Sequence, residues 1–193
     1  MDIEARLLAG WRPRAFVALD FETANRSSSS ACAVALVRVE GDRIVGRVVD
    51  LIRPPTQHFE FTDIHGITSA DVADRSTFGE VWKTLLPVVQ GSQFLAAHNA
   101  AFDRDVLESC CRNARISVPD VPFVCTVALA RLKWKLHPTK LPDVCAFLGL
   151  IRLCPFFDPG AVAAAIDGLP DTLAADDSTW ALVYDFEGKP AWL

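Results

Sequence analysis

The sequence has no apolar run long enough to cross a membrane as a helix. Such a helix needs about 20 mostly apolar residues, and no stretch of the 193 residues approaches that length. The first residues, MDIEARLLAGWRPR, carry acidic before basic side chains and have no long apolar core, so they are unlike a signal peptide. We therefore expect no membrane association and a cytoplasmic location.

An excess of basic residues is also missing. The chain has 19 Lys and Arg against 24 Asp and Glu, a formal net charge of −5. A protein that binds duplex nucleic acid by covering its phosphates needs an excess of Lys and Arg. The composition argues against that mode of binding, and it leaves room for a small active site that holds a phosphate through metal ions.

Paired cysteines of the CxxC type are absent as well. The chain has six cysteines, several of them inside apolar runs such as ACAVALV and VCAFLGL. Zinc sites and redox centres usually show close cysteine pairs. We therefore expect buried free thiols in a reducing compartment.

The length and the hydrophobic content of 51% suit one domain with a substantial core. Apolar patterning predicts strands at 15–21, 31–39, 44–52 and 94–98, a strand passing into a helix at 123–133, and helices at 69–73, 78–89, 103–114, 140–150 and 160–169. Strands that alternate with helices indicate an α/β sheet with helical cover, and this sheet opens with three antiparallel strands. We divide the chain into an extension (1–14), the main domain (15–169) and a divergent tail (170–193).

Two carboxylates stand out in the first strand, within VALDFETANR at residues 17–26. Asp20 and Glu22 are two positions apart, so their side chains point to the same face of a strand. Two like charges this close repel each other unless a cation lies between them, and Mg²⁺ or Mn²⁺ prefers such oxygen ligands. The pair predicts a divalent metal site; the alternative is a solvated strand end.

Two further acids lie at the ends of predicted elements. Asp103 follows a predicted strand in LAAHNAAFDRDVL, and Asp158 precedes the last predicted helix in LCPFFDPGAVAAA. Either residue could serve only as a helix cap, a position where Asp is favoured. Together with Asp20 and Glu22 they make the four acids that a two-metal site needs.

Four motifs occur in order over residues 15 to about 150: DFETAN, IHGIT, HNAAFD and KLPDVCAFLGL. This series resembles the DnaQ-like (DEDD) 3′–5′ exonucleases, the family of the proofreading epsilon subunit of bacterial DNA polymerase III and of ribonuclease T. The resemblance implies a ribonuclease H-like mixed sheet, antiparallel in its first three strands and then parallel, with helices on both faces. It also implies two Mg²⁺ or Mn²⁺ ions and hydrolysis of nucleotides from single-stranded DNA 3′ ends, with RNA as an alternative substrate and a DNA polymerase as a candidate partner.

The resemblance assigns the metal ions to Asp20, Glu22, Asp103 and Asp158. It assigns contacts with the substrate to five other positions. The backbone of Thr23 would meet the terminal 3′ hydroxyl, and Asn99 and Phe102 would line the pocket of the last nucleotide. His65 and Ile67 would pack by the terminal bases, where stacking is worth about 1–3 kcal/mol per base.

The chain departs from the family pattern before Asp158. One subgroup has a histidine five residues before the fourth acid as general base, and another has a tyrosine four residues before it; here these positions are Leu153 and Cys154. Three explanations are open: activity has been lost or weakened, another histidine substitutes, or a change of reading frame has rewritten the end of the chain. His137 is the candidate substitute, and a metal-bound hydroxide formed without a protein base is the alternative. A module that binds nucleic-acid ends or a polymerase without catalysis is the rival from another class.

Overall fold

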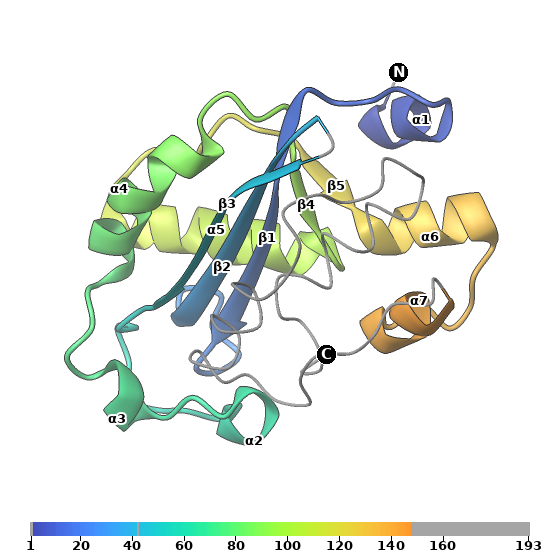
Figure 1. Cartoon of the computed structure of the whole chain (residues 1–193). Coiled ribbons are helices and arrows are strands. Elements are labelled where there is room, and N and C mark those ends of the chain that lie inside the picture. Colours follow the sequence, from blue (N-terminus) through green and yellow to red (C-terminus); the bar gives the residue numbers. More distant parts are fainter. Residues whose placement is uncertain (1, 42, 148–193) are drawn as a thin grey trace.

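A five-stranded sheet forms the centre of the computed structural model, which describes residues 2–41 and 43–147. Its strands are β1 (Ala15–Thr23), β2 (Ala31–Glu40), β3 (Arg43–Leu51), β4 (Leu95–Ala97) and β5 (Phe123–Cys125), arranged in the order β3-β2-β1-β4-β5 (Figure 1). The pairs β1–β2 and β2–β3 are antiparallel, whereas β1–β4 and β4–β5 are parallel. The predicted mixed sheet is confirmed.

Alternate residues of β1 point into two different cores, as the two-residue period of a strand requires. Val17, Leu19 and Phe21 belong to a core formed with the helices α4 (Phe78–Val89) and α5 (Ala100–Ala114). Phe16 and Ala18 belong to a second core on the other face, which the N-terminal helix and Leu129 of α6 (Thr126–Trp134) help to cover. Asp20 and Glu22 continue the series of Phe16 and Ala18, so their side chains point away from α4 and α5.

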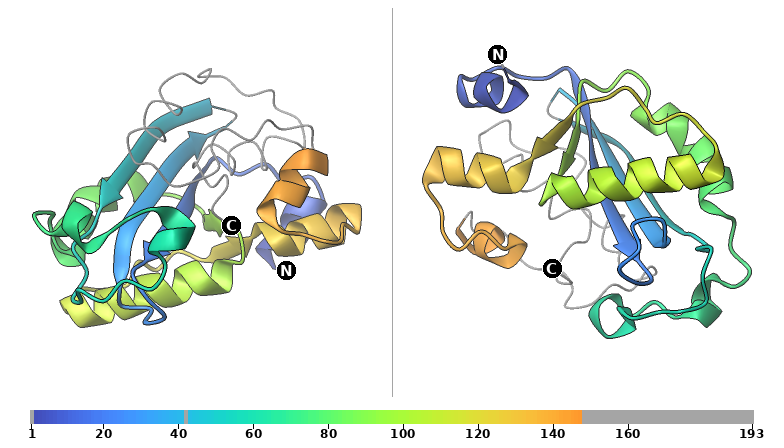
Figure 2. Two further views of the ribbon diagram at one scale, coloured as in Figure 1. Left: turned by 90° about the horizontal axis from the view of Figure 1, so that it is seen from below. Right: turned by 180° about the vertical axis from the view of Figure 1, so that it is seen from behind.

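The helices cover both faces of the sheet, as predicted. They are α1 (Ile3–Leu8), α2 (Thr62–His65), α3 (Ser69–Val72), α4 (Phe78–Val89), α5 (Ala100–Ala114), α6 (Thr126–Trp134) and α7 (Leu141–Phe147). Seen from behind, α5 crosses in front of the strands, while α1 and α6 lie to one side of them (Figure 2), and residues of α1 and α6 pack in the core of the opposite face. None of these helices is long and apolar enough to span a membrane.

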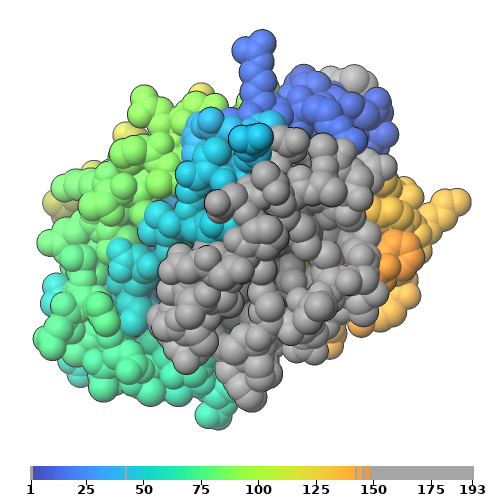
Figure 3. Space-filling view, viewed as in Figure 1, coloured from blue at the N-terminus to red at the C-terminus, as the bar shows by residue number. Residues whose placement is uncertain are grey.

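Three helices differ from the sequence expectation. The extension contains α1, which has no buried residue and lies at the upper edge of the space-filling view (Figure 3); Ile3 and Leu7 hold it against the second core. The short α2 lies between the strand predicted at 44–52 and the helix predicted at 69–73, where the sequence predicted no helix. Helix α5 begins three residues earlier than predicted, because Asn99 turns the chain with a φ of 62° and helical geometry follows at once. The helix expected at 160–169 and the tail at 170–193 lie outside the described residues.

Candidate active site at the end of strand β1

Asp20 and Glu22 lie near the carboxyl end of β1, on one face. Asp20 is 5% exposed, and Glu22 is partly buried. Their partners across the ladder on β2 are Ala35 and Ala33. Because partners directly opposite each other are near neighbours, two alanines keep bulky β2 side chains away from the acids.

Asp103 reaches the same end of β1 from α5. Its Oδ1 atom accepts a hydrogen bond from the backbone N–H of Phe21 at 3.0 Å, and the side chain is fully buried. This contact is available because β4 pairs with β1 only at Val17 and Ala18, so the N–H of Phe21 lies beyond the reach of that strand. An acid 82 positions away in sequence thus binds the peptide group between Asp20 and Glu22.

The local fold explains how Asp103 is placed. Asn99 is in the left-handed region, a conformation that asparagine tolerates better than most residues, and α5 starts directly after it. Asp103 therefore lies in the first turn of α5, where the helix dipole favours a negative charge. Asn99 is exposed, and Phe102 is 42% exposed, so both side chains present surface at the corner where Asp103 meets β1.

The corner lies between β1 and β4, where the strand order of the sheet reverses. In open α/β sheets, ligands bind outside the carboxyl ends of strands at such a reversal. The chain therefore brings Asp20, Glu22 and Asp103 to a position where this class of fold commonly binds its ligands.

Protein encloses three other predicted site residues near the end of β1, which are Thr23, His65 and Ile67. Their exposed fractions are 4%, 1% and 2%. The His65 ring contacts the Thr23 carbonyl and the Ile67 backbone N–H, so this side chain packs against the end of β1. The resemblance placed His65 and Ile67 beside the terminal bases, and this role stays a prediction for two side chains that are almost fully buried.

The negative charge of Glu22 acts on a thiol of the neighbouring strand β2. The pKa of the Cys32 thiol is raised, mainly by burial and secondly by the charge of Glu22. Cys32 is a free cysteine, as are Cys110, Cys111 and Cys125, in agreement with the expectation of free thiols. A cation beside Glu22 would offset this field.

Within residues 2–41 and 43–147, no group of three or more His, Cys, Asp or Glu side chains is placed so that it could hold a metal ion. The three acids supply only carboxylate oxygens, the donor type that Mg²⁺ and Mn²⁺ prefer. The chemistry of the donor set therefore fits these ions, and additional ligands would have to come from the fourth acid, water or a bound phosphate. Asp158, Leu153 and Cys154 lie outside the described residues.

His137 is exposed in the segment that follows α6. The segment is anchored by His98, which directly follows β4: its Nε2 lies 2.9 Å from the Thr139 carbonyl and its Nδ1 lies 3.0 Å from the Thr126 hydroxyl. The anchor holds Thr139, two positions after His137, at the end of β4. This role of His98 is not visible in the sequence, because its partners lie 28 and 41 positions away.

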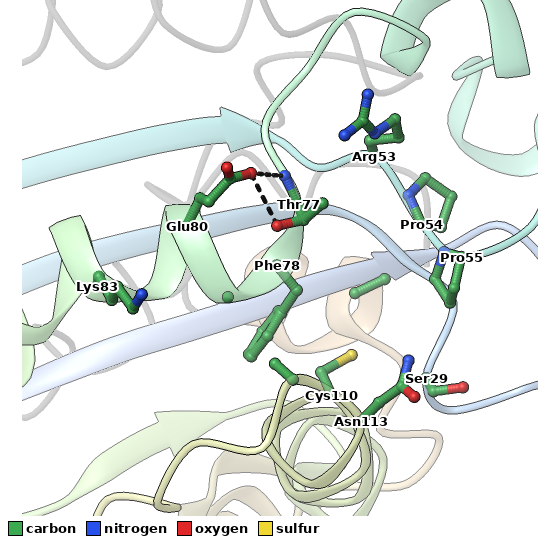
Figure 4. Close-up of a pocket in the computed structure, with 13 residues that line it drawn as sticks. Ser29, Arg53, Pro54, Pro55, Thr77, Phe78, Glu80, Lys83, Cys110 and Asn113 are labelled. Carbon is green, nitrogen blue, oxygen red and sulfur yellow. Dashed lines mark hydrogen bonds between the residues drawn. The ribbon is translucent and has the colours of Figure 1, made fainter.

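A pocket of about 450 Å³ opens between α4 and α5 (Figure 4). Its lining includes Phe78 and Cys110, which pack in the same core as Phe21. Since Asp20 and Glu22 point to the opposite face of β1, this pocket is separate from the acids.

Comparisons with known proteins agree with the geometry. A model of the RNase_T exonuclease family matches residues 17–151. Exodeoxyribonuclease 10 of Escherichia coli K12 is 36% identical over 171 residues, which cover 82% of this chain and 69% of that protein. The PolC-type DNA polymerase III of Thermotoga maritima is 30% identical over 138 residues, which are 70% of this chain and 10% of the polymerase. The chain thus spans about a tenth of that polymerase.

Solved structures show the same fold. Exonuclease X in complex with 5′ overhanging duplex DNA aligns with a TM-score of 0.59 at 24% identity, covering 87% of this chain and 89% of that one. The nuclease domain of 3′hExo, a DEDDh family member bound to rAMP, aligns with a TM-score of 0.65 at 18% identity, with 90% of each chain covered. The chain therefore belongs to the DnaQ-like DEDD exonuclease family and has its ribonuclease H-like fold.

Proposed function

We propose that the protein is a metal-dependent 3′–5′ exonuclease that removes nucleotides from the 3′ ends of single-stranded DNA. The observation that carries this proposal is the hydrogen bond between the Phe21 N–H and Asp103, which joins Asp103 to the strand of Asp20 and Glu22. The 36% identity to an exodeoxyribonuclease over 82% of the chain supports DNA over RNA as the substrate.

The four predicted acids, Asp20, Glu22, Asp103 and Asp158, would hold two Mg²⁺ or Mn²⁺ ions. When bound, such ions activate the attacking water and stabilise the leaving 3′ oxygen. The contribution of the chain is to hold the carboxylates in place: Asp20 and Glu22 by the pleat of β1, and Asp103 by its hydrogen bond to β1.

The exposed side chains beside Asp103 would receive the substrate. Phe102 offers an apolar surface to the terminal base or sugar, and Asn99 offers an amide at the entrance of the same corner. Thr23 follows the metal acids, and its backbone would meet the 3′ hydroxyl. These contacts would favour an unpaired 3′ end, because the terminal nucleotide must leave its base stack to fit beside the end of β1.

Among the proposed parts of the site, the general base for the attacking water has the least support. The family position is Leu153, and the candidate substitute is His137. General-base help typically contributes about 10²- to 10⁴-fold, so a site that relies on metal-bound hydroxide would retain reduced activity. We therefore propose a slow enzyme.

The proposal is tested with a 5′-labelled single-stranded DNA oligomer and Mn²⁺, sampled over time. A ladder that shortens from the 3′ end is expected with the wild-type protein and should be lost in Asp20→Asn, which removes the charge and keeps the shape. Asp120→Asn is the matched control, since this acid is exposed in a loop outside all four motifs. A ladder of equal intensity in Asp20→Asn would refute the metal role of the strand.

An RNA oligomer of equal sequence separates the two substrates. Faster degradation of RNA would favour the exoribonuclease alternative. Metal-dependent binding of ends without turnover on either substrate would favour the non-catalytic module. A DNA polymerase partner stays a prediction, supported only by the match to a tenth of the PolC-type polymerase.

A further inference from the structure

The pairing of β1 with β2 is interrupted where β1 leaves the acids. Glu22 pairs with Ala33, whereas Thr23 pairs with Ala31. Cys32 is thus an extra residue on β2, and the ladder is irregular at this point. A bulge of this kind disrupts the local hydrogen bonds, and buried backbone groups need other partners there.

His65 supplies that partner for the carbonyl of Thr23. Its Nε2 atom lies 3.1 Å from the Thr23 oxygen, and its Nδ1 atom lies 3.0 Å from the backbone nitrogen of Ile67. A neutral imidazole has one donor and one acceptor nitrogen. Because the Ile67 N–H can only donate, Nδ1 accepts and Nε2 carries the proton that it donates to Thr23. Burial lowers the pKa of His65, and the hydrogen bond to Thr23 opposes this effect in part.

The ring is one of several links between the end of β1 and residues 58–67, which we call the α2 arm. The Asn25 side chain donates to the carbonyl of His58 at 2.9 Å, and the Glu60 N–H donates to the carbonyl of Ala24 at 2.6 Å. Thr23, Ala24 and Asn25 are therefore each bound to the α2 arm. His65 makes the link that lies next to Glu22, and in this link the arm contributes a buried side chain.

We propose that His65 is a positioning residue that fixes Glu22 and the Thr23 backbone in the orientation needed to bind a metal ion and the 3′ hydroxyl. This inference rests on the proposed function. It gives His65 a different role from stacking on terminal bases, since its ring is 1% exposed and both of its nitrogens are bound to backbone groups. A displacement of about 1 Å in a reacting group can cost about 10²-fold in rate, so a loosened strand end would be costly.

Two substitutions separate the two nitrogens of the ring. In His65→Gln the amide can reach the position of Nε2 and still donate to Thr23. In His65→Asn the shorter amide can accept from Ile67 at the position of Nδ1, but it does not reach Thr23. His58→Asn is the control, because the His58 side chain is 72% exposed and its link to Asn25 uses only the backbone.

Amide hydrogen exchange at residues 21–25 without metal is the first measurement. His65→Asn should exchange about tenfold faster or more there, whereas His65→Gln and His58→Asn should stay within about threefold of wild type. Calorimetric titration with Mn²⁺ should show weaker binding in His65→Asn, and kcat on labelled DNA should fall with little change in KM. Unfolding temperatures of all variants report any general loss of stability.

Equal exchange and equal Mn²⁺ affinity in His65→Asn and wild type would overturn the proposal. So would equal losses in the two His65 variants, because a merely space-filling ring does not depend on Nε2. A rise in KM at constant kcat would return His65 to the role of a base contact. If the wild-type protein proves inactive on nucleic acid, the exchange and Mn²⁺ measurements still decide the role of His65.

Discussion

Asp103 combines a structural contact with a predicted metal-binding charge, and two substitutions separate them. Asp103→Ala removes the fully buried carboxylate that accepts the hydrogen bond of the Phe21 N–H. A hydrogen bond to a charged group contributes about 1.5–3 kcal/mol, and for a chain of this size 1 kcal/mol corresponds to about 2–4 °C in Tm. We expect Asp103→Ala to lower Tm by about 3–12 °C. Asp103→Asn keeps a carbonyl oxygen in place and should lose much less.

The activities of the two variants should not follow their stabilities. Both lack the carboxylate, so both should lose nuclease activity by about 100-fold or more, which exceeds the usual effect of removing a neighbour of a metal ligand. Thermal unfolding followed by circular dichroism in EDTA gives the stability, and the labelled DNA oligomer gives the rate. Full activity in Asp103→Asn would refute the metal role, and equal Tm values for Asp103→Ala and Asp103→Asn would refute the structural contact.

Three further predictions concern residues outside this contact. Burial raises the pKa of Cys110 to about 11 and that of Cys111 to about 12. The stability that these protonated thiols contribute is therefore present below the ordinary thiol pKa of 9.0, and it is lost as the pH rises through the folded values. Alkylation mapped by mass spectrometry at about pH 9 should label both only after unfolding, and rapid labelling of the native protein would contradict their burial. Arg38 donates to the carbonyls of Val88 and Gln90 at the end of α4, at 2.6 and 2.9 Å. In urea titrations Arg38→Ala should lower the unfolding free energy by about 1.5–3 kcal/mol, and Arg38→Lys should lower it by less. Equal values for the two variants would contradict the role of the planar guanidinium group. If His137 is the general base, His137→Ala should lower kcat by about 10²- to 10⁴-fold, and an unchanged rate would leave metal-bound hydroxide as the source of the nucleophile.

Much of the fold was predictable because its signals are local. The alternation of side chains in a strand placed Asp20 and Glu22 on one face, and the helical spacing from Phe78 to Val89 gave the observed bounds of α4. The α2 arm was not predicted as a helix, because its single turn holds only four residues and a helix that short has almost no periodic pattern. What holds it is contact with Thr23 and its neighbours, more than thirty positions away.

The position of Asp103 shows why the candidate site was only partly predictable. The sequence suggested two roles for Asp103: the cap of a helix, since an acid before an apolar repeat is typical of that position, and a metal ligand beside Asp20 and Glu22. In the structure the helix begins at Ala100, and the Asp103 carboxylate is bound to a different strand.

Two features outside the acid itself produce this arrangement. Asn99 adopts a positive φ of 62°, which starts α5 early and turns Asp103 towards β1. Strand β4 has only three residues, so it ends before it could pair with Phe21, and a carboxylate occupies the edge that a longer strand would have covered. A longer β4 would give the Phe21 N–H a carbonyl partner and exclude Asp103 from the corner. The length of β4 therefore matters to the site as much as the identity of the acids, and a sequence motif that lists only the acids does not contain this information.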